Sequence, residues 1–366
     1  MSLTRRKFAR ALLGSGAALA APALLAAARK PKAREAAYYE KLGGGKVVCR
    51  LCPRECRVVS GSRGSCGVRE NRGGTYYTLV YGQPCSVHVD PIEKKPLFHY
   101  LPGSQALSLA TAGCNFSCCF CQNWEISQRL PEEVETVDLP AATAVRLARQ
   151  RGCRVVAHTY NEPVVFYEYV RDCAELGREA GVPSVMISNG YIRKEPMREL
   201  CRRLGAVKID LKAFSETFYR EQCGGALKPV LETLLTVRAE KTWLEVVVLL
   251  IPGLNDSARE VESMCRWLAR ELGPDVPLHF SRFSPTYRLK NLPPTPPATL
   301  MAARRIALDA GIRFCYVGNL LSDAENTACP SCGRVLLRRI MYSVANEGLQ
   351  DGRCRFCGAT IPGVFS

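Results

Sequence analysis

The feature of this chain that most limits its possible folds is an alternation of short apolar runs with longer amphipathic segments between residues 106 and 317. Seven runs of five to nine residues have the length of buried strands, and the segments between them have the length and periodicity of helices. A parallel connection needs a crossover, so this alternation predicts a parallel sheet covered by helices. We therefore expect an α/β fold, namely an α/β barrel or part of one.

The expected elements follow from the apolar pattern alone. The expected strands are 106–112, 154–160, 184–188, 206–211, 243–251, 277–283 and 313–317. The expected helices are 140–151, 164–180, 194–204, 228–240, 257–272 and 298–310. In such barrels the chemistry collects where strands end and loops begin.

Nineteen cysteines among 366 residues are the most unusual part of the composition, and eleven of them fall in three tight groups. Disulfide frameworks rarely place cysteines two or three residues apart in three separate groups, whereas metal ligation requires such spacing. The groups are Cys49, Cys52, Cys56 and Cys66; Cys114, Cys118 and Cys121; and Cys329, Cys332, Cys354 and Cys357.

The middle group, in "TAGCNFSCCFCQNWEIS", has the spacing C-x3-C-x2-C and directly follows the first expected strand. Three thiolates can hold three irons of a [4Fe-4S] cluster and leave the fourth iron open to another ligand, whereas an electron-transfer cluster takes four cysteines. The alternatives are a zinc knuckle or a set of packed apolar thiols. Cys119 lies off the spacing and is expected to be a bystander.

This spacing, with Phe120 before the last cysteine, resembles the radical S-adenosylmethionine (SAM) superfamily. The resemblance implies a partial (β/α)6 TIM-type barrel, and a fourth iron that binds the amino and carboxylate groups of SAM. It also implies reductive cleavage of SAM to a 5'-deoxyadenosyl radical, which takes hydrogen from a substrate, with Cys114, Cys118 and Cys121 carrying the catalysis. A low-potential electron donor is then a required partner.

The resemblance also implies which side chains contact SAM. The second strand ends in "HTYNEP", where the superfamily more often has Gly-Gly-Glu, and "KIDLKAF" resembles the Asp-x-Lys of glycyl-radical activating enzymes. A barrel-rim ion pair is the alternative for Asp210 and Lys212. The sixth strand offers Ser284 where the activators have a histidine, and His279 fits a core position equally well. The expected cofactor-binding residues are Phe120, Gln122, Asn161, Glu162, Asn189, Asp210 and Lys212.

A narrower resemblance covers the chain from about residue 40 to its end. The blocks "CRLCPRECRV", "GSCGVREN", "DPIEKKPLFHYLPGSQALSLATAGCNFSCCFCQNWEIS", "TYNEP", "LLIPGLND" and "CPSCG...CRFCGATIPG" resemble the radical SAM enzyme of the AmmeMemoRadiSam system. That family is related to the activators of pyruvate formate-lyase, and the resemblance supplies no substrate. A protein substrate is one possibility.

The two flanking cysteine groups predict two further metal sites. C-x2-C-G repeated after twenty-one residues, at Cys329, Cys332, Cys354 and Cys357, predicts a structural zinc ribbon, with a rubredoxin-like iron as the alternative. The spacing of Cys49, Cys52, Cys56 and Cys66 suits zinc and an auxiliary [4Fe-4S] cluster equally, because four thiolates serve both.

Several other polar or sulfur-bearing residues are expected to be structural. Lys94, Lys95 and His99 belong to a connector and are expected on a solvated charged face. Cys85 and Cys223 fall on expected loops and receive no role. Small buried apolar positions account for Cys153, Cys173, Cys201, Cys265 and Cys315.

The first thirty residues follow a different logic. "TRRKF" precedes an Ala/Gly/Leu run and predicts a twin-arginine signal for export to the periplasm, with a basic amphipathic terminus in a cytoplasmic protein as the alternative. Residues 1–34 hold eight basic and no acidic residues, which is half of the formal charge of +16, so nucleic-acid binding is not expected. No run is apolar enough to predict a permanent membrane span.

We therefore expect four parts and weigh three functions. The parts are a signal and basic linker (1–34), a four-cysteine module with its connector (35–99), a partial barrel (100–322) and a zinc-ribbon-like module (323–366). The functions are a radical SAM enzyme with an unidentified substrate, an activating enzyme for a glycyl-radical enzyme, and a non-enzymatic iron-sulfur or zinc protein for electron transfer or scaffolding.

Overall fold

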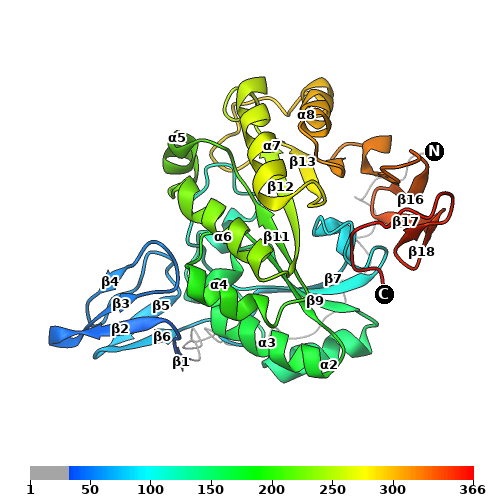
Figure 1. Ribbon diagram of the computed structural model, residues 1–366. Coiled ribbons are helices and arrows are strands. Elements are labelled where there is room, and N and C mark those ends of the chain that lie inside the picture. The colour runs from blue at the N-terminus through cyan, green and yellow to red at the C-terminus, as the bar shows by residue number, and fades with distance from the viewer. Residues whose placement is uncertain (1–32) are drawn as a thin grey trace, which may run out of the picture. The chain divides into compact units, whose positions relative to one another are not determined.

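A mostly parallel sheet of eight strands forms the centre of the computed structural model, which describes residues 33–366 (Figure 1). Seven strands run parallel, and the strand that precedes them in the chain pairs antiparallel with the first. In spatial order they are β14 (Cys315–Gly318), β13 (Leu278–Arg282), β12 (Trp243–Leu250), β11 (Ala206–Asp210), β10 (Ser184–Ser188), β9 (Val155–His158), β8 (Gln105–Ala110) and β7 (Ser86–Pro91).

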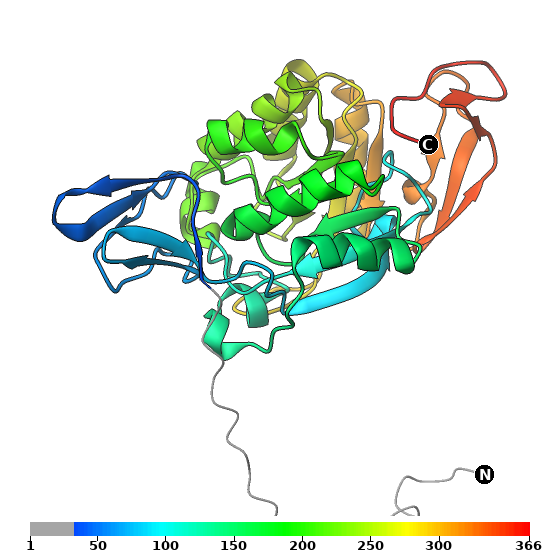
Figure 2. The same cartoon turned by 90° about the horizontal axis from the view of Figure 1, so that it is seen from below.

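All seven predicted strands and all six predicted helices are confirmed, with ends that differ by a few residues. Each crossover adds the next strand on the same side, and right-handed crossovers in one direction place their helices on one face of a sheet. Figures 1 and 2 show these helices as one layer along the sheet. They are α2 (Ala141–Gln150), α3 (Tyr167–Glu179), α4 (Lys194–Cys201), α6 (Leu227–Ala239), α7 (Ala258–Leu272) and α8 (Pro297–Asp309).

The sheet is buried on both faces in its centre. Every residue of β9 and β10 is buried, as continuous apolar runs in a parallel sheet predict. Among the described residues, β7 and β14 each pair with a single neighbour, so the sheet is open. Its curvature into a partial barrel stays a prediction.

Helix α7 shows how the sequence sets the ends of an element. The Ser257 side chain accepts the backbone N–H of Glu260 and caps the first turn. The helix ends at Leu272, before Gly273 with a φ of 90°. The helix is thus bounded by a capping serine and a terminating glycine.

The segment before the central sheet forms two small antiparallel sheets. One joins β1 (Arg34–Glu35), β6 (Thr75–Thr78) and β5 (Arg69–Arg72), and the other joins β2 (Tyr39–Leu42), β3 (Lys46–Cys49) and β4 (Arg57–Val58). The predicted boundary at residues 99 and 100 falls after β7, which already belongs to the central sheet.

The segment after the central sheet forms a three-stranded sheet and a two-stranded hairpin. The strands are β15 (Thr327–Ala328), β16 (Val335–Ile340), β17 (Ser343–Asn346), β18 (Leu349–Gln350) and β19 (Arg353–Cys354). This C-terminal segment packs on residues 98–101. Arg339 Nη2 donates to the carbonyl of Phe98 at 2.8 Å, and the backbone N–H of Leu101 donates to Val364 at 2.7 Å.

The predicted twin-arginine signal lies outside the described residues. Within residues 33–366, no helix has the length and apolar character needed to cross a bilayer.

Candidate functional site

The loop that follows β8 carries the three cysteines with C-x3-C-x2-C spacing. It starts at Gly113, with a φ of 86°, where a Cβ atom would lie 2.6 Å from the carbonyl oxygen of Cys66. Only glycine fits this close approach between the loop and the N-terminal module. Cys114, Cys118 and Cys121 all line one cavity of about 490 Å³.

Side chains from neighbouring elements hold the backbone of this cysteine loop in place. Asn161 Nδ2 donates to the Gly113 carbonyl at 2.8 Å, and Asn123 Nδ2 donates to the Tyr160 carbonyl at 2.7 Å. The loop after β9 and the cysteine loop therefore brace each other. Since the Asn161 side chain is committed to this contact, its predicted contact with SAM would have to come from its backbone.

Glu162 is one of the residues that line this cavity. It is buried, and its carboxylate accepts from Ser188 Oγ at 2.7 Å and from the backbone N–H groups of Val164 at 3.0 Å and Asn189 at 2.7 Å. Burial raises its pKa to about 7, and these hydrogen bonds oppose the rise. The carboxylate thus ties the end of β9 to the end of β10.

Asn189 brings the end of β10 to the first cysteine. Its Nδ2 donates to Asn115 Oδ1 at 2.9 Å and lies 3.9 Å from Cys114 Sγ. Burial and the nearby Glu162 nevertheless raise the pKa of Cys114. Asn189 lines the main cavity, its polar partners are residues of the cysteine loop, and its contact with SAM stays a prediction.

Lys208 and Asp210 lie at the end of β11, and Lys212 follows the strand. Asp210 Oδ2 accepts from Lys212 Nζ at 3.2 Å, and Oδ1 accepts from Lys208 Nζ. Although burial opposes it, the two ammonium groups lower the pKa of Asp210 to about 2. All three side chains line the main cavity, so this ion-pair group faces the place where a ligand would bind.

The two predicted residues around the last cysteine also line the cavity. Phe120 is buried against Phe218, with ring centroids 5.7 Å apart, and Gln122 lies at the cavity surface. Cys119 does not line this cavity among the described residues, and its backbone N–H donates to the Gln222 carbonyl at 2.8 Å.

The sequence reasoning missed Cys223, which it left unassigned on a loop. Cys223 is fully buried against Cys118, and a hydrogen bond between the two thiols lowers the pKa of Cys118. The backbone N–H of Ser117 also donates to the Cys223 carbonyl at 2.9 Å. A cysteine one hundred residues away gives no sequence signal of this contact.

The prediction that Lys95 and His99 lie on a solvated face is wrong. Lys95 is only 2% exposed, lines the main cavity and donates to Asp90 Oδ2 at 2.7 Å. His99 is buried between Tyr316 Oη and the Pro362 carbonyl. The antiparallel strand β7 explains the error, because it carries the connector onto the central sheet.

Tyr160 completes the group around Lys95. Its hydroxyl donates to Asp90, the Lys95 ammonium lies 4.4 Å from the centroid of its ring, and its φ is 68°. A positive φ at a bulky residue costs free energy and marks a backbone held by its surroundings. This strained position lies at the end of β9, in the loop predicted to receive SAM.

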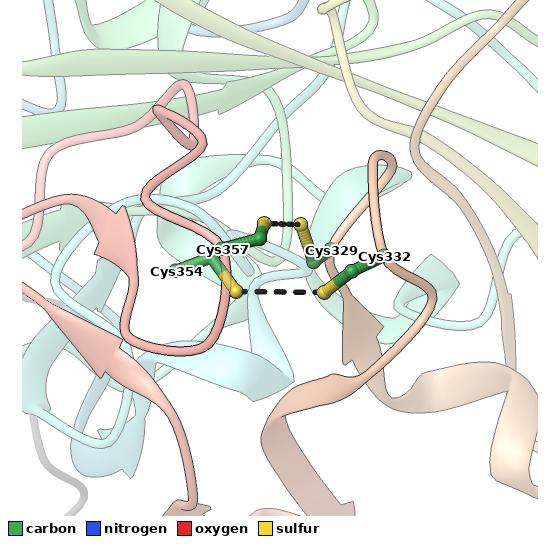
Figure 3. Close-up of side chains that lie close together, drawn as sticks. All are labelled: Cys329, Cys332, Cys354 and Cys357. Atoms are coloured by element: carbon green, nitrogen blue, oxygen red, sulfur yellow. Dashed lines mark hydrogen bonds between the residues drawn. The ribbon is translucent and has the colours of Figure 1, made fainter.

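The C-terminal cysteines have the geometry of a single metal ion (Figure 3). Cys329 Sγ lies 3.6 Å from Cys357 Sγ, and Cys332 Sγ lies 3.7 Å from Cys354 Sγ. Tetrahedral zinc with Zn–S bonds of about 2.3 Å places its sulfurs about 3.8 Å apart. Two loops, one after β15 and one after β19, bring the four thiols together.

The N-terminal cysteines are spaced differently. Among residues 33–366, the C-terminal set is the only group of three or more His, Cys, Asp or Glu side chains whose ligand atoms all lie within 4.8 Å of one another. No three of Cys49, Cys52, Cys56 and Cys66 meet that limit. Their sulfurs are nevertheless close enough to interact, because burial and the neighbouring Cys49 raise the pKa of Cys52 to about 12. These four sulfurs are therefore neighbours at wider spacing.

The sequence matches the Radical SAM superfamily over residues 108–268, a span that includes all three cysteines of the loop. The chain belongs to the radical SAM superfamily. A protein of Methanocaldococcus jannaschii described as uncharacterized is 43% identical over 331 residues, which cover 90% of this chain and 98% of the relative. Members of the superfamily use a [4Fe-4S] cluster and SAM, and the residues of the cavity fit that pair.

The chain is also related to the pyruvate formate-lyase activating enzymes. Pyruvate formate-lyase 1-activating enzyme of Escherichia coli K12 is 26% identical over 151 residues, or 39% of this chain and 60% of that enzyme. Among solved structures, a radical SAM methyltransferase from Sphaerobacter thermophilus is 16% identical, with a TM-score of 0.48 over 64% of this chain and 71% of that one.

Proposed function

We propose that this protein is a radical SAM enzyme whose Cys114, Cys118 and Cys121 hold a [4Fe-4S] cluster that cleaves SAM reductively. The observation that carries the proposal is one cavity of about 490 Å³ lined by all three cysteines and by Glu162, Asn189, Asp210 and Lys212. Its volume is within the usual range for a small-molecule site.

The chemistry proposed for the bound cofactors is a one-electron cleavage of the SAM sulfonium that yields methionine and a 5'-deoxyadenosyl radical, which takes a hydrogen atom from the substrate. The electron comes from a low-potential donor. The protein's own residues bind and orient SAM and exclude water around it. Lys208, Asp210, Lys212 and Glu162 would surround the bound SAM with charged groups, because all four line the same cavity.

Adjacent cysteines give a matched test. Anaerobically reconstituted protein, incubated with SAM and dithionite, should form 5'-deoxyadenosine. Cys118→Ala should abolish the product, whereas Cys119→Ala should retain it, because only Cys118 has the ligand spacing. No product from the unchanged protein would favour the non-enzymatic alternative of an electron-transfer or scaffold protein.

The relation to pyruvate formate-lyase activating enzymes supports a second candidate, transfer of the radical to a glycine of a partner protein. A stable glycyl radical in the electron paramagnetic resonance (EPR) spectrum, after candidate partners are mixed with reduced enzyme and SAM, would support it. Transfer of deuterium from a labelled small molecule into 5'-deoxyadenosine would contradict it. The sequence blocks quoted above further support membership of the AmmeMemoRadiSam system.

We also propose an identity for each flanking metal. The sulfur spacing supports zinc at Cys329, Cys332, Cys354 and Cys357. At the N-terminal module, the wider spacing favours an auxiliary [4Fe-4S] cluster over one zinc ion, because cluster ligands attach to different irons. Cys66 and Cys114 line a shared cavity of about 300 Å³, so the two modules adjoin.

Metal analysis separates these assignments. A variant with Cys114, Cys118 and Cys121 all changed to Ala should retain about four irons and one zinc per chain. Two zinc ions and no iron in that variant would exclude the auxiliary cluster.

Export by the twin-arginine pathway is proposed from "TRRKF" alone. Cell fractionation of the tagged protein should find it in the periplasm, and Arg5→Lys with Arg6→Lys should retain it in the cytoplasm. Equal distribution of both forms would favour the cytoplasmic alternative.

A further inference from the structure

A second cavity of about 290 Å³ adjoins the main one. Five residues line both cavities, and we refer to these five residues as the neck and to the second cavity as the side cavity. The neck residues are Lys94, Pro96, Ser281, Asn319 and Tyr342. A group bound at the neck would therefore lie beside a ligand in the main cavity.

The polar side chains of the neck can all donate a hydrogen bond, and none is a carboxylate. They are the ammonium group of Lys94, the hydroxyl groups of Ser281 and Tyr342, and the amide of Asn319. Ser281, on β13, is only 9% exposed, and its hydroxyl has no hydrogen-bond partner among the described residues. A buried hydroxyl without a partner costs free energy unless water or a ligand completes it.

Lys94 brings a positive charge to the neck that its own surroundings do not neutralise. Asp90 accepts from Lys94 Nζ at 2.8 Å and from Lys95 Nζ at 2.7 Å, so two ammonium groups share one carboxylate. The Lys95 side chain is 1% exposed, whereas the Lys94 side chain is 44% exposed. An ammonium group has three donors, so Lys94 can keep its bond to Asp90 and still bind a ligand.

A second group of two lysines and one aspartate lines the main cavity. Asp210 accepts from both Lys208 and Lys212, which again leaves one positive charge in excess. The two groups lie close together, because the positive charges of Lys94 and Lys208 help burial to lower the pKa of Lys95 to about 8. Since Asp210 and Lys212 are predicted to contact SAM, Lys94 carries the surplus charge that is left for another ligand.

The acidic side chains nearby do not cancel this charge at the neck. Glu162 lines the main cavity, but burial raises its pKa to about 7 and its carboxylate already accepts three hydrogen bonds. The Glu93 side chain is fully buried and lies 4.0 Å from Arg339. Glu325 lines the side cavity but not the main one, and burial raises its pKa to about 7. A negatively charged group is thus favoured on the main-cavity side of the neck.

We propose that the enzyme's substrate carries a carboxylate, which binds the Lys94 ammonium and the Ser281 hydroxyl at the neck. One surplus charge matches a monoanion better than a phosphate group, which carries about −1.5 to −2 at pH 7. The apolar wall of the side cavity, which includes Phe98 and Leu320, takes the hydrocarbon portion of such a substrate. The word substrate rests on the proposed function, whereas the carboxylate site itself does not.

Matched six-carbon probes test this site without any turnover. Anaerobically reconstituted protein, saturated with SAM and without reductant, is titrated at pH 7.5 with n-hexanoate, hexanamide and n-hexyl phosphate by isothermal calorimetry. Hexanoate should bind about tenfold more tightly than the neutral hexanamide, because only the carboxylate gains from an ammonium donor. Equal affinities for these two probes, or tighter binding of hexyl phosphate than of hexanoate, would overturn the proposal. A preference for hexanoate in a protein that does not cleave SAM would support the carboxylate site and contradict only the proposed function.

Variants at position 94 locate the carboxylate. Lys94→Gln should lose the preference for hexanoate, whereas Lys94→Arg should retain it because it keeps the positive charge. Lys95 still neutralises Asp90 in each variant, so both should fold. Lys228→Gln, at the exposed start of α6, is the control and should keep the preference of the unchanged protein. Ser281→Ala should weaken hexanoate about fivefold through loss of one donor. An unchanged preference in Lys94→Gln with native iron content would place the carboxylate elsewhere and overturn the proposal.

Discussion

Glu162 Oε2 accepts the backbone N–H of Asn189 at 2.7 Å, and this hydrogen bond joins the ends of β9 and β10 across the floor of the main cavity. Asn189 in turn lies 3.9 Å from Cys114 Sγ through its Nδ2. A buried carboxylate therefore positions the donor that faces the first cysteine. Both residues were predicted from the sequence to contact SAM, and the structure gives them this shared positioning role in addition.

Glu162→Gln should impair SAM cleavage while the chain still folds. The carboxylate accepts three hydrogen bonds. The amide NH₂ group of glutamine would face one of these hydrogen-bond donors in place of an acceptor oxygen. Such a mismatch costs about 1–3 kcal/mol, which corresponds to roughly 5- to 150-fold in 5'-deoxyadenosine formation. Glu195→Gln, exposed on α4, is the control and should match the unchanged protein. Full activity of Glu162→Gln would show that the cavity does not depend on this carboxylate.

Asp210→Asn should weaken SAM binding. Asp210 neutralises Lys208 and Lys212, and its loss leaves two ammonium groups without a carboxylate in a buried place. We expect at least a tenfold rise in the Kd for SAM, measured from the change that SAM produces in the EPR signal of the reduced cluster. Asp309→Asn, at the exposed end of α8, should leave the Kd unchanged. An unchanged Kd in Asp210→Asn would favour the alternative of a barrel-rim ion pair.

Glu168→Gln should destabilise the fold without removing metal. Glu168 on α3 forms a buried ion pair with Arg69 of the N-terminal module, and it also accepts the backbone N–H of Ala37 at 2.7 Å. Removal of one partner from such a pair costs about 3–5 kcal/mol. The apparent Tm of anaerobic protein should fall on the order of 10 °C. Glu179→Gln, exposed on the same helix, should leave it unchanged.

Cys332→Ala should release zinc and expose the C-terminal module to protease. The module has only a small apolar core of its own, so the proposed zinc ion would supply much of its stability. We expect about one zinc fewer per chain, unchanged iron, and faster tryptic cleavage within residues 323–366. Cys119→Ala should retain the zinc. A stable Cys332→Ala protein that still binds zinc would contradict the assignment of a four-thiol zinc site.

The alternation of apolar runs was enough to predict the strands and helices of the central sheet, because buried parallel strands are read from local composition. The spacing of Cys114, Cys118 and Cys121 likewise marked the centre of the site. Lys95 and Cys223 show where such reasoning stops. Lys95 reaches the site because β7, just before it, pairs with β8 in the central sheet. Cys223 reaches it because residues 222–223 pair with the cysteine loop, which is distant in sequence. Lys208 was missed for a different reason, since its charge hid a strand position that faces the cavity.

His99 should make the protein less stable in acid. Its ring bonds to the Pro362 carbonyl at 2.6 Å and to Tyr316 Oη at 2.5 Å, and Glu245, His279 and Arg339 are the charged or titratable groups near it. Burial lowers its pKa from 6.5 to about 4, so the unfolded chain binds the proton first as pH falls. The stability that His99 contributes is therefore complete above pH 6.5 and is lost progressively down to pH 4. At pH 5 the loss amounts to about 2 kcal/mol.

His99→Gln should flatten the dependence of Tm on pH between 7 and 5, whereas His88→Gln, on the partly exposed strand β7, should retain the slope of the unchanged protein. An equal slope in His99→Gln would assign the acid sensitivity to other groups, such as the thiolates of the proposed zinc site.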